Sequence, residues 1–125
     1  MCYNFTSKFI FLEAIVQIKL NENESREVLH KLKDRLDDGS ITYVSVSDGA
    51  YQCTYYSPSG TSVNYKMFDR LGQVILSVEA QSIAVEIFLT EENSKLFDLV
   101  RRWMEHVHNR PSLENATARF LSYTS

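Results

Sequence analysis

Histidine and cysteine are the side chains of this sequence best suited to metal binding or nucleophilic catalysis, and they number three and two. His106 and His108 are two positions apart in a helical segment, so they point to different sides and lack the i, i+4 spacing of a helical metal pair. Cys2 and Cys53 have no Cys-x-x-Cys partner, which disfavours zinc and dithiol chemistry. We therefore expect no metal site, and we interpret all three histidines, including His30, as surface residues.

Serine catalysis and nucleotide binding have little support. The turn at 57–60 carries two serines, but it lacks the G-x-S-x-G pattern of a nucleophile elbow. The chain has no G-x-G-x-x-G or Walker A sequence, and its four glycines cannot build a phosphate-binding loop of the usual kind. We expect no cofactor.

Carboxylates are the remaining candidates for acid–base chemistry. Glu13, Glu79 and Glu86 fall on one face of the predicted sheet, with Lys66 near enough to tune their pKa values if the register holds. We keep Lys66, Glu79 and Glu86 as a candidate polar site. Ordinary solvated glutamates are the alternative interpretation.

The elements that position these residues form a single α+β domain over 1–125. Apolar residues at period two predict a long N-terminal strand over 9–20, after a flexible N-terminus at 1–8. Asn21 and Glu24 are spaced as a capping box, and helical spacing of leucines predicts a helix over about 23–38. The dipeptide at 48–49, Asp-Gly, and three later turn signals then separate an antiparallel meander of five strands, at 41–47, 50–56, 61–68, 73–79 and 82–89.

A long amphipathic helix follows the meander. Thr90 is expected to cap it, and Pro111 stops it. Its apolar stripe is Leu96, Phe97, Val100, Trp103, Met104 and Val107. The residues 111–125 are expected to form a C-terminal tail with a short helix, and both long helices are expected to pack on one face of the sheet.

Side-chain parity assigns the strand residues to two faces. With even-numbered hairpin loops, the helix-covered face carries Tyr43, Tyr56, Val63, Tyr65, Met67, Val74, Leu76, Val78, Ile83, Val85, Ile87 and Leu89. The opposite face is polar in part, but it also carries Tyr51, Cys53, Tyr55, Phe68, Ile75 and Phe88. Soluble monomers seldom expose a large apolar patch, so this face is predicted to meet a partner. The alternative is that the C-terminal tail or a bulged register covers it.

Tyrosine is concentrated in the same region. The chain has seven tyrosines, five of them within 43–65. Tyrosine is enriched at recognition surfaces, although strands also favour it for its own sake. We predict partner contacts through Tyr51, Tyr55, Phe68, Ile75 and Phe88.

Composition narrows the function class. The chain of 125 residues is 44% apolar and 23% charged, as in globular proteins, and its net charge of −3 disfavours nucleic-acid binding. The apolar segment 9–20 is too short to span a membrane and lacks a signal-peptide pattern, so we expect no membrane association and a cytoplasmic, reducing location. The pair Arg101-Arg102 is interpreted as a solvated helix face because acidic residues surround it.

The sequence therefore favours a noncatalytic protein-binding module, such as a small inhibitor, immunity protein or adaptor, that acts through the open sheet face and self-associates. The alternative is a small oligomeric enzyme or ligand-binding protein. Its site would form between subunits from Tyr51, Tyr55, Lys66, Glu79 and Glu86.

Overall fold

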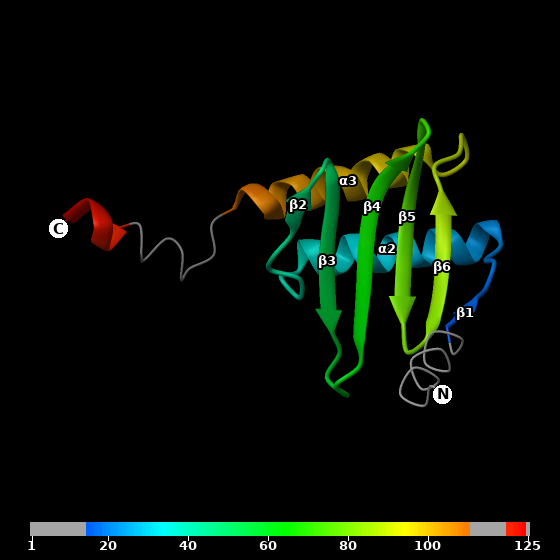
Figure 1. Cartoon of the computed structure of the whole chain (residues 1–125), viewed down its shortest axis with the longest axis horizontal. Coiled ribbons are helices and arrows are strands. Elements are labelled where there is room, and N and C mark those ends of the chain that lie inside the picture. Colours follow the sequence, from blue (N-terminus) through cyan, green and yellow to red (C-terminus); the bar gives the residue numbers. More distant parts are fainter. Residues whose placement is uncertain (1–14, 111–119, 125) are drawn as a thin grey trace, which may run out of the picture.

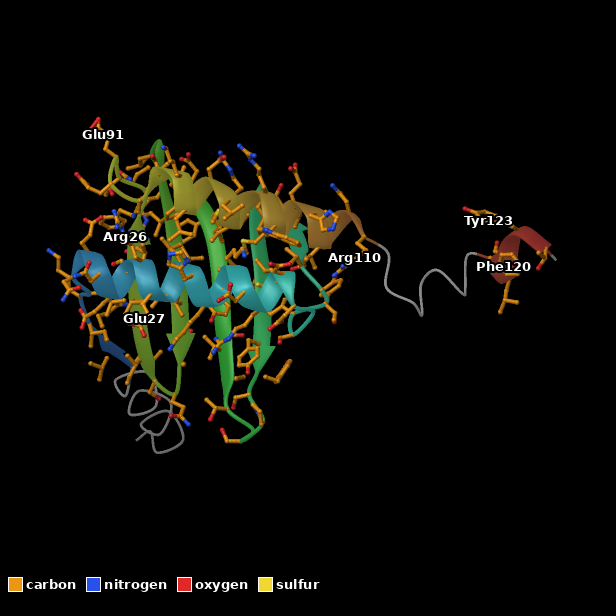
Figure 2. The ribbon with its side chains drawn as sticks, turned by 180° about the vertical axis from the view of Figure 1, so that it is seen from behind. Arg26, Glu27, Glu91, Arg110, Phe120 and Tyr123 are labelled. Atoms are coloured by element: carbon orange, nitrogen blue, oxygen red, sulfur yellow. The ribbon has the colours of Figure 1, made fainter. Side chains whose placement is uncertain are left out.

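The computed structural model of this chain describes residues 15–110 and 120–124. The described part holds a six-stranded mixed sheet, two long helices and a helical turn at 120–124, which confirms the α+β class. Figure 1 looks onto the sheet with both long helices behind it, and Figure 2 shows the same helices in front. One face of the sheet is therefore covered by helices, whereas the other faces away from them.

The sheet has the strand order β1-β6-β5-β4-β3-β2. Five strands are antiparallel neighbours in chain order, namely β2 (Ser45–Ser47), β3 (Ala50–Tyr56), β4 (Ser62–Arg70), β5 (Gln73–Ala80) and β6 (Ile83–Phe88). Strand β1 (Val16–Gln17) lies parallel to β6 at the edge. Of the strand predicted over 9–20, the described residues show only the two residues of β1 as strand. Residues 1–14 lie outside the described part of the chain, and so do most residues of the predicted C-terminal tail.

Helix α2 (Glu22–Asp37) begins at the predicted capping box. The Asn21 side chain accepts the Glu24 N–H at 2.8 Å, and the Glu24 carboxylate accepts the Asn21 N–H at 2.9 Å. This reciprocal pair satisfies two of the free amides at the helix start. After the helix, Gly39 adopts φ of 86°, a left-handed conformation that turns the chain toward the sheet.

Helix α3 (Ser94–Asn109) begins four residues after Thr90, so the predicted cap at Thr90 is wrong. Residues 91–93 form a turn instead, because Asn93 binds the chain before it. The Asn93 Oδ1 accepts the Thr90 N–H at 2.8 Å, and Asn93 Nδ2 donates to the Phe88 carbonyl at 3.0 Å. The buried Asn93 amide thereby fixes the start of α3 against the end of β6.

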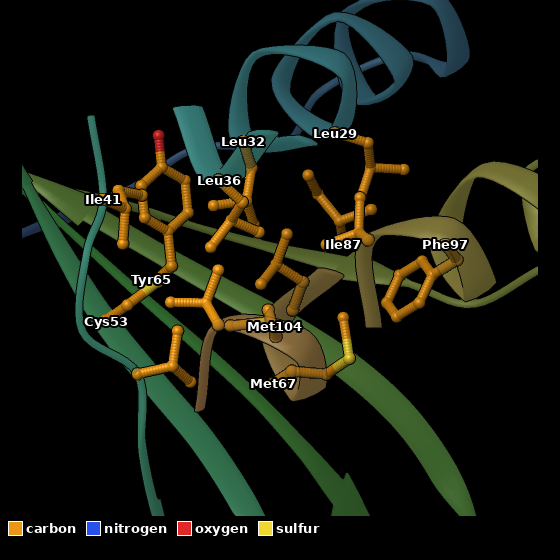
Figure 3. Close-up of a cluster of buried hydrophobic side chains, with 14 residues drawn as sticks. Leu29, Leu32, Leu36, Ile41, Cys53, Tyr65, Met67, Ile87, Phe97 and Met104 are labelled. Carbon is orange, nitrogen blue, oxygen red and sulfur yellow. The ribbon is translucent and has the colours of Figure 1, made fainter. Parts of the chain in front are cut away.

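The hydrophobic core lies between the two long helices and the sheet (Figure 3). Three leucines of α2 and one face of α3 meet the inward side chains of the strands. The buried members are Leu29, Leu32, Leu36, Ile41, Val44, Cys53, Tyr65, Met67, Leu76, Ile87, Phe97, Val100, Met104 and Val107. Trp103 is half-buried at the edge of this core, with its ring 5.4 Å from that of His106 in an edge-to-face arrangement.

The face predicted for β3 is wrong, because the β3–β4 loop has an odd number of residues. Tyr56 pairs with Ser62, which leaves the five residues 57–61 in the loop. The loop closes through the Ser57 N–H, which donates to the Thr61 carbonyl at 2.8 Å. An odd loop reverses side-chain parity, so every side chain of β3 changes face relative to the prediction.

Four tyrosines are affected by this correction. Tyr51 and Tyr55 lie on the same side as their cross-strand partners Met67 and Val63, under the helices. Tyr56 instead faces away from the core and is 73% exposed. Tyr43, which precedes β2, is also outside the core at 70% exposure.

Candidate functional site

An apolar row crosses the open face of the sheet. Phe68 on β4 is paired with Ile75 on β5, and Ile75 is paired with Phe88 on β6. Their neighbours along the strands, Met67 and Leu76, are in the core, so the row itself lies on the opposite face. We call Phe68, Ile75 and Phe88 the aromatic row. The sequence prediction placed these three residues together, and the structure does so as well.

The ion pair between Arg70 and Glu86 covers the middle of the aromatic row. Arg70 Nη1 and Nη2 donate to Glu86 Oε1 and Oε2 at 3.3 and 2.7 Å, a bidentate geometry. Arg70 lies opposite Gln73 and Glu86 lies opposite Ser77, so the pair crosses β5 at the level of Ile75, which lies midway between them. Ile75 itself is 1% exposed although it points away from the helices.

The outer members of the row are more accessible. Phe88 is 47% exposed, and Phe68 is half-buried. The Phe68 ring lies between two cations on its own strand, with Arg70 Cζ 5.3 Å and Lys66 Nζ 5.5 Å from its centroid. Both distances allow cation–π attraction between the Phe68 ring and the two basic side chains.

Sequence reasoning missed Arg70, because residues 69–72 read as a turn. In the structure β4 continues to Arg70, and the turn contains Leu71 and Gly72 alone. The signal that would have found it is the alternation of Lys66, Phe68 and Arg70 along one face. Hydrogen bonds from the guanidinium to the Glu86 carboxylate raise the pKa of Arg70 above its ordinary value.

The residues of the candidate polar site lie on the open face in two neighbouring cross-strand rows. Lys66 and Glu86 share a cross-strand row with Ser77 between them, whereas Glu79 lies one row further along β5, opposite Asn64. Both carboxylate oxygens of Glu86 already accept from Arg70. Glu86 is therefore engaged as the acceptor of an ion pair.

Tyr51 and Tyr55 lie on the other side of the sheet from this row. Arg35 of α2 stacks over the Tyr55 ring at 3.8 Å from its centroid and donates from Nη1 to the Tyr65 hydroxyl at 2.7 Å. Burial raises the pKa of Tyr65 above its ordinary value. These contacts give Tyr55 and Tyr65 a packing role between α2 and the sheet, so the predicted placement of Tyr51 and Tyr55 on the open face is corrected.

The structure also locates the other groups considered for chemistry. Burial raises the pKa of the Cys53 thiol to about 12, so the thiol stays protonated and unreactive at neutral pH. Arg101 and Arg102 both pair with Asp98, at 3.1 and 2.8 Å, and these contacts hold the pKa of Asp98 below its ordinary value. The arginine pair is thus neutralised in part by its own helix.

Within residues 15–110 and 120–124, no group of three or more His, Cys, Asp or Glu side chains is arranged to hold a metal ion. Within the same residues, no helix has the length and apolar character needed to cross a membrane.

Comparison with known proteins yielded no match, whether to family models, to curated sequences or to solved structures.

Proposed function

We propose that this chain is a noncatalytic protein-binding module that acts through the open face of its sheet, in the manner of a small inhibitor, immunity protein or adaptor. The observation that carries the proposal is the aromatic row, which presents Phe68 and Phe88 on the side of the sheet away from the helices. Aromatic side chains at the centre of an interface usually supply most of its binding energy.

The surroundings of the row support a protein partner. Lys66, Arg70 and Glu86 border the aromatic rings with charged groups. Aromatic side chains and arginine are both enriched at protein interfaces, so this mixed surface supports a protein partner. Ile75 is too deeply buried to touch a partner, and we assign it the supporting role of holding the two phenylalanines apart.

The alternative is an enzyme with an inter-subunit site. Tyr51 and Tyr55 lie on the helix-covered face, whereas Lys66, Glu79 and Glu86 lie on the open face, so a single copy would not supply both groups to one site. The predicted cytoplasmic location stays part of the proposal, and the buried free thiol of Cys53 is compatible with a reducing compartment.

The test compares two variants of β6 that match in exposure. Phe88 and Ile83 are both 47% exposed, but Phe88 is on the open face and Ile83 is on the other. Affinity capture with quantitative mass spectrometry is expected to recover one protein with the wild type and with Ile83→Thr, and to lose it with Phe88→Thr. Identical recovery with all three would contradict the proposal, as would a bound metabolite as the main copurifying species.

A further inference from the structure

Strand β3 has an outer edge that its neighbour covers only in part. The pairs between β2 and β3 are Ser47 with Ala50, Val46 with Tyr51 and Ser45 with Gln52. Strand β3 continues to Tyr56, so residues 53–56 extend beyond the end of β2 (Figure 1). Within the described part of the chain, the sheet has no strand beside that segment.

In an antiparallel ladder, the main-chain groups of successive residues point alternately to the two neighbouring strands. This alternation identifies the residues of β3 whose main-chain groups point toward its uncovered edge. Ser47 and Ala50 flank a two-residue turn, so they are a hydrogen-bonded pair, and every second residue of β3 faces β2. The main-chain N–H and C=O groups of Ala50 and Gln52 are thus directed at β2. The main-chain N–H and C=O groups of Thr54 and Tyr56 point to the same side but lie past the end of β2, where they can pair with another strand.

A groove accompanies the free edge. It has a volume of about 420 Å³ and runs between the chain before β2, at Thr42 and Tyr43, and the β3 residues Thr54 and Tyr56. Tyr43 and Tyr56 are 70% and 73% exposed. A groove therefore separates the free edge of β3 from the chain before β2, and two large exposed aromatic rings line it.

Charge distinguishes this edge from the opposite edge of the sheet. No charged residue occurs from 49 to 65, so Lys, Asp or Glu side chains of β3 do not block the approach of a strand. At the other edge, β1 is two residues long and is soon followed by Lys19 and Glu22. Charges are a usual protection of sheet edges, and the segment of β3 beyond β2 has none.

We propose that the free edge of β3 pairs antiparallel with the same edge of a second copy of this chain, across a two-fold axis. The register that fits places Thr54 opposite the partner's Tyr56, with the axis at Tyr55. In this register both outward-facing residues form hydrogen-bonded pairs, and Gln52 keeps its own pairing with Ser45. A two-fold axis brings each edge against itself, and a neutral edge can do so without like charges meeting.

This pairing involves a surface different from the aromatic row. Phe68, Ile75 and Phe88 lie on β4 to β6 and stay accessible in the paired form. The two copies would share one continuous sheet, with both open faces on the same side. The inference and the proposed partner binding can therefore fail separately.

The test removes a single outward-facing donor. Proline is tolerated at strand edges, and Thr54→Pro deletes the N–H that would donate to the partner while the ladder with β4 is kept. Thr54→Val is the matched control, because it loses the same hydrogen bond between Thr54 Oγ1 and Asn64 but retains the N–H. Sedimentation velocity across a concentration series measures the monomer–dimer equilibrium, and circular dichroism confirms folding.

We expect a wild-type dimer, a Thr54→Val dimer, and a dimer dissociation constant raised about tenfold or more in Thr54→Pro. A wild-type chain that stays monomeric at several hundred micromolar would overturn the inference. So would a dimer that Thr54→Pro leaves intact.

If Thr54→Pro fails to fold, amide hydrogen exchange of the wild type supplies the answer. Protection of the Thr54 and Tyr56 amides should rise with protein concentration, because only the dimer pairs them. Exchange of both amides that does not vary with concentration would contradict the pairing.

Discussion

The two faces of the sheet bury apolar side chains by different means, as two neighbours on β5 show. Leu76 and Ile75 are 0% and 1% exposed, yet they point in opposite directions. Leu76 is enclosed by the helices and the strands, whose backbone holds the surrounding atoms in place. Ile75 lies in the cross-strand row between Phe68 and Phe88, and the Arg70–Glu86 ion pair crosses β5 at its level. We therefore expect the two faces to differ in rigidity although these two residues are equally buried.

Leu76→Ala should have the largest effect on stability. It removes side-chain volume from a core that helices cannot easily refill, so we expect a loss of about 3 to 5 kcal/mol in the free energy of unfolding. Urea denaturation measures the change. A loss below about 1 kcal/mol would show that the helix-covered face is loosely packed.

Ile75→Ala should destabilise less, by about 2 kcal/mol, although the two residues are equally buried. The side chains that cover Ile75 belong to the surface and can collapse into the space. The same denaturation measurement compares the two variants. If Ile75→Ala costs as much as Leu76→Ala, the open face is as rigid as the core and the distinction between the faces is wrong.

Tyr65→Phe tests the hydrogen bond between Arg35 and Tyr65 on the helix-covered face. We expect the free energy of unfolding to fall by about 1 kcal/mol. The substitution keeps the ring but removes the hydroxyl that accepts from Arg35. Thermal unfolding of this variant and of Arg35→Met measures the contribution of the contact from each side. A Tyr65→Phe variant as stable as the wild type would mean that water replaces the lost partner.

Arg70→Gln should have the smallest effect on stability, because the Arg70 and Glu86 side chains are 50% and 31% exposed and their attraction is screened. We expect a small fall in melting temperature that shrinks at high salt. If Arg70→Gln instead lowers the melting temperature as much as Ile75→Ala does, and the decrease is independent of salt, the ion pair is an integral part of the packing.

The sequence predicted well those features that depend on local spacing. Asn21 and Glu24 are close in sequence, so their capping box is readable without a fold. The faces of the last three strands followed because their turns contain two residues each, at 71–72 and 81–82. The aromatic row is a direct consequence of that register.

The predicted face of β3 was wrong because a difference of one residue in the length of the β3–β4 loop decides which side chains point to the core. Nothing in the sequence Ser57-Pro58-Ser59-Gly60-Thr61 states whether Thr61 begins β4 or belongs to the loop, and that choice sets the face of Tyr51 and Tyr55. Asn93 was overlooked because its partner, the Phe88 carbonyl, becomes close only after the chain turns. The ion pair over Ile75 likewise requires three strands to be in register.

Binding affinity of the open face is the most direct test of the proposed function. With the captured partner purified, isothermal titration of Phe88→Thr should show an affinity about 30-fold weaker than that of the wild type, equivalent to about 2 kcal/mol. Ile83→Thr should bind within about threefold of the wild type, since its equally exposed side chain lies on the other face. Equal loss in both variants, or no loss in Phe88→Thr, would contradict a binding surface centred on the aromatic row.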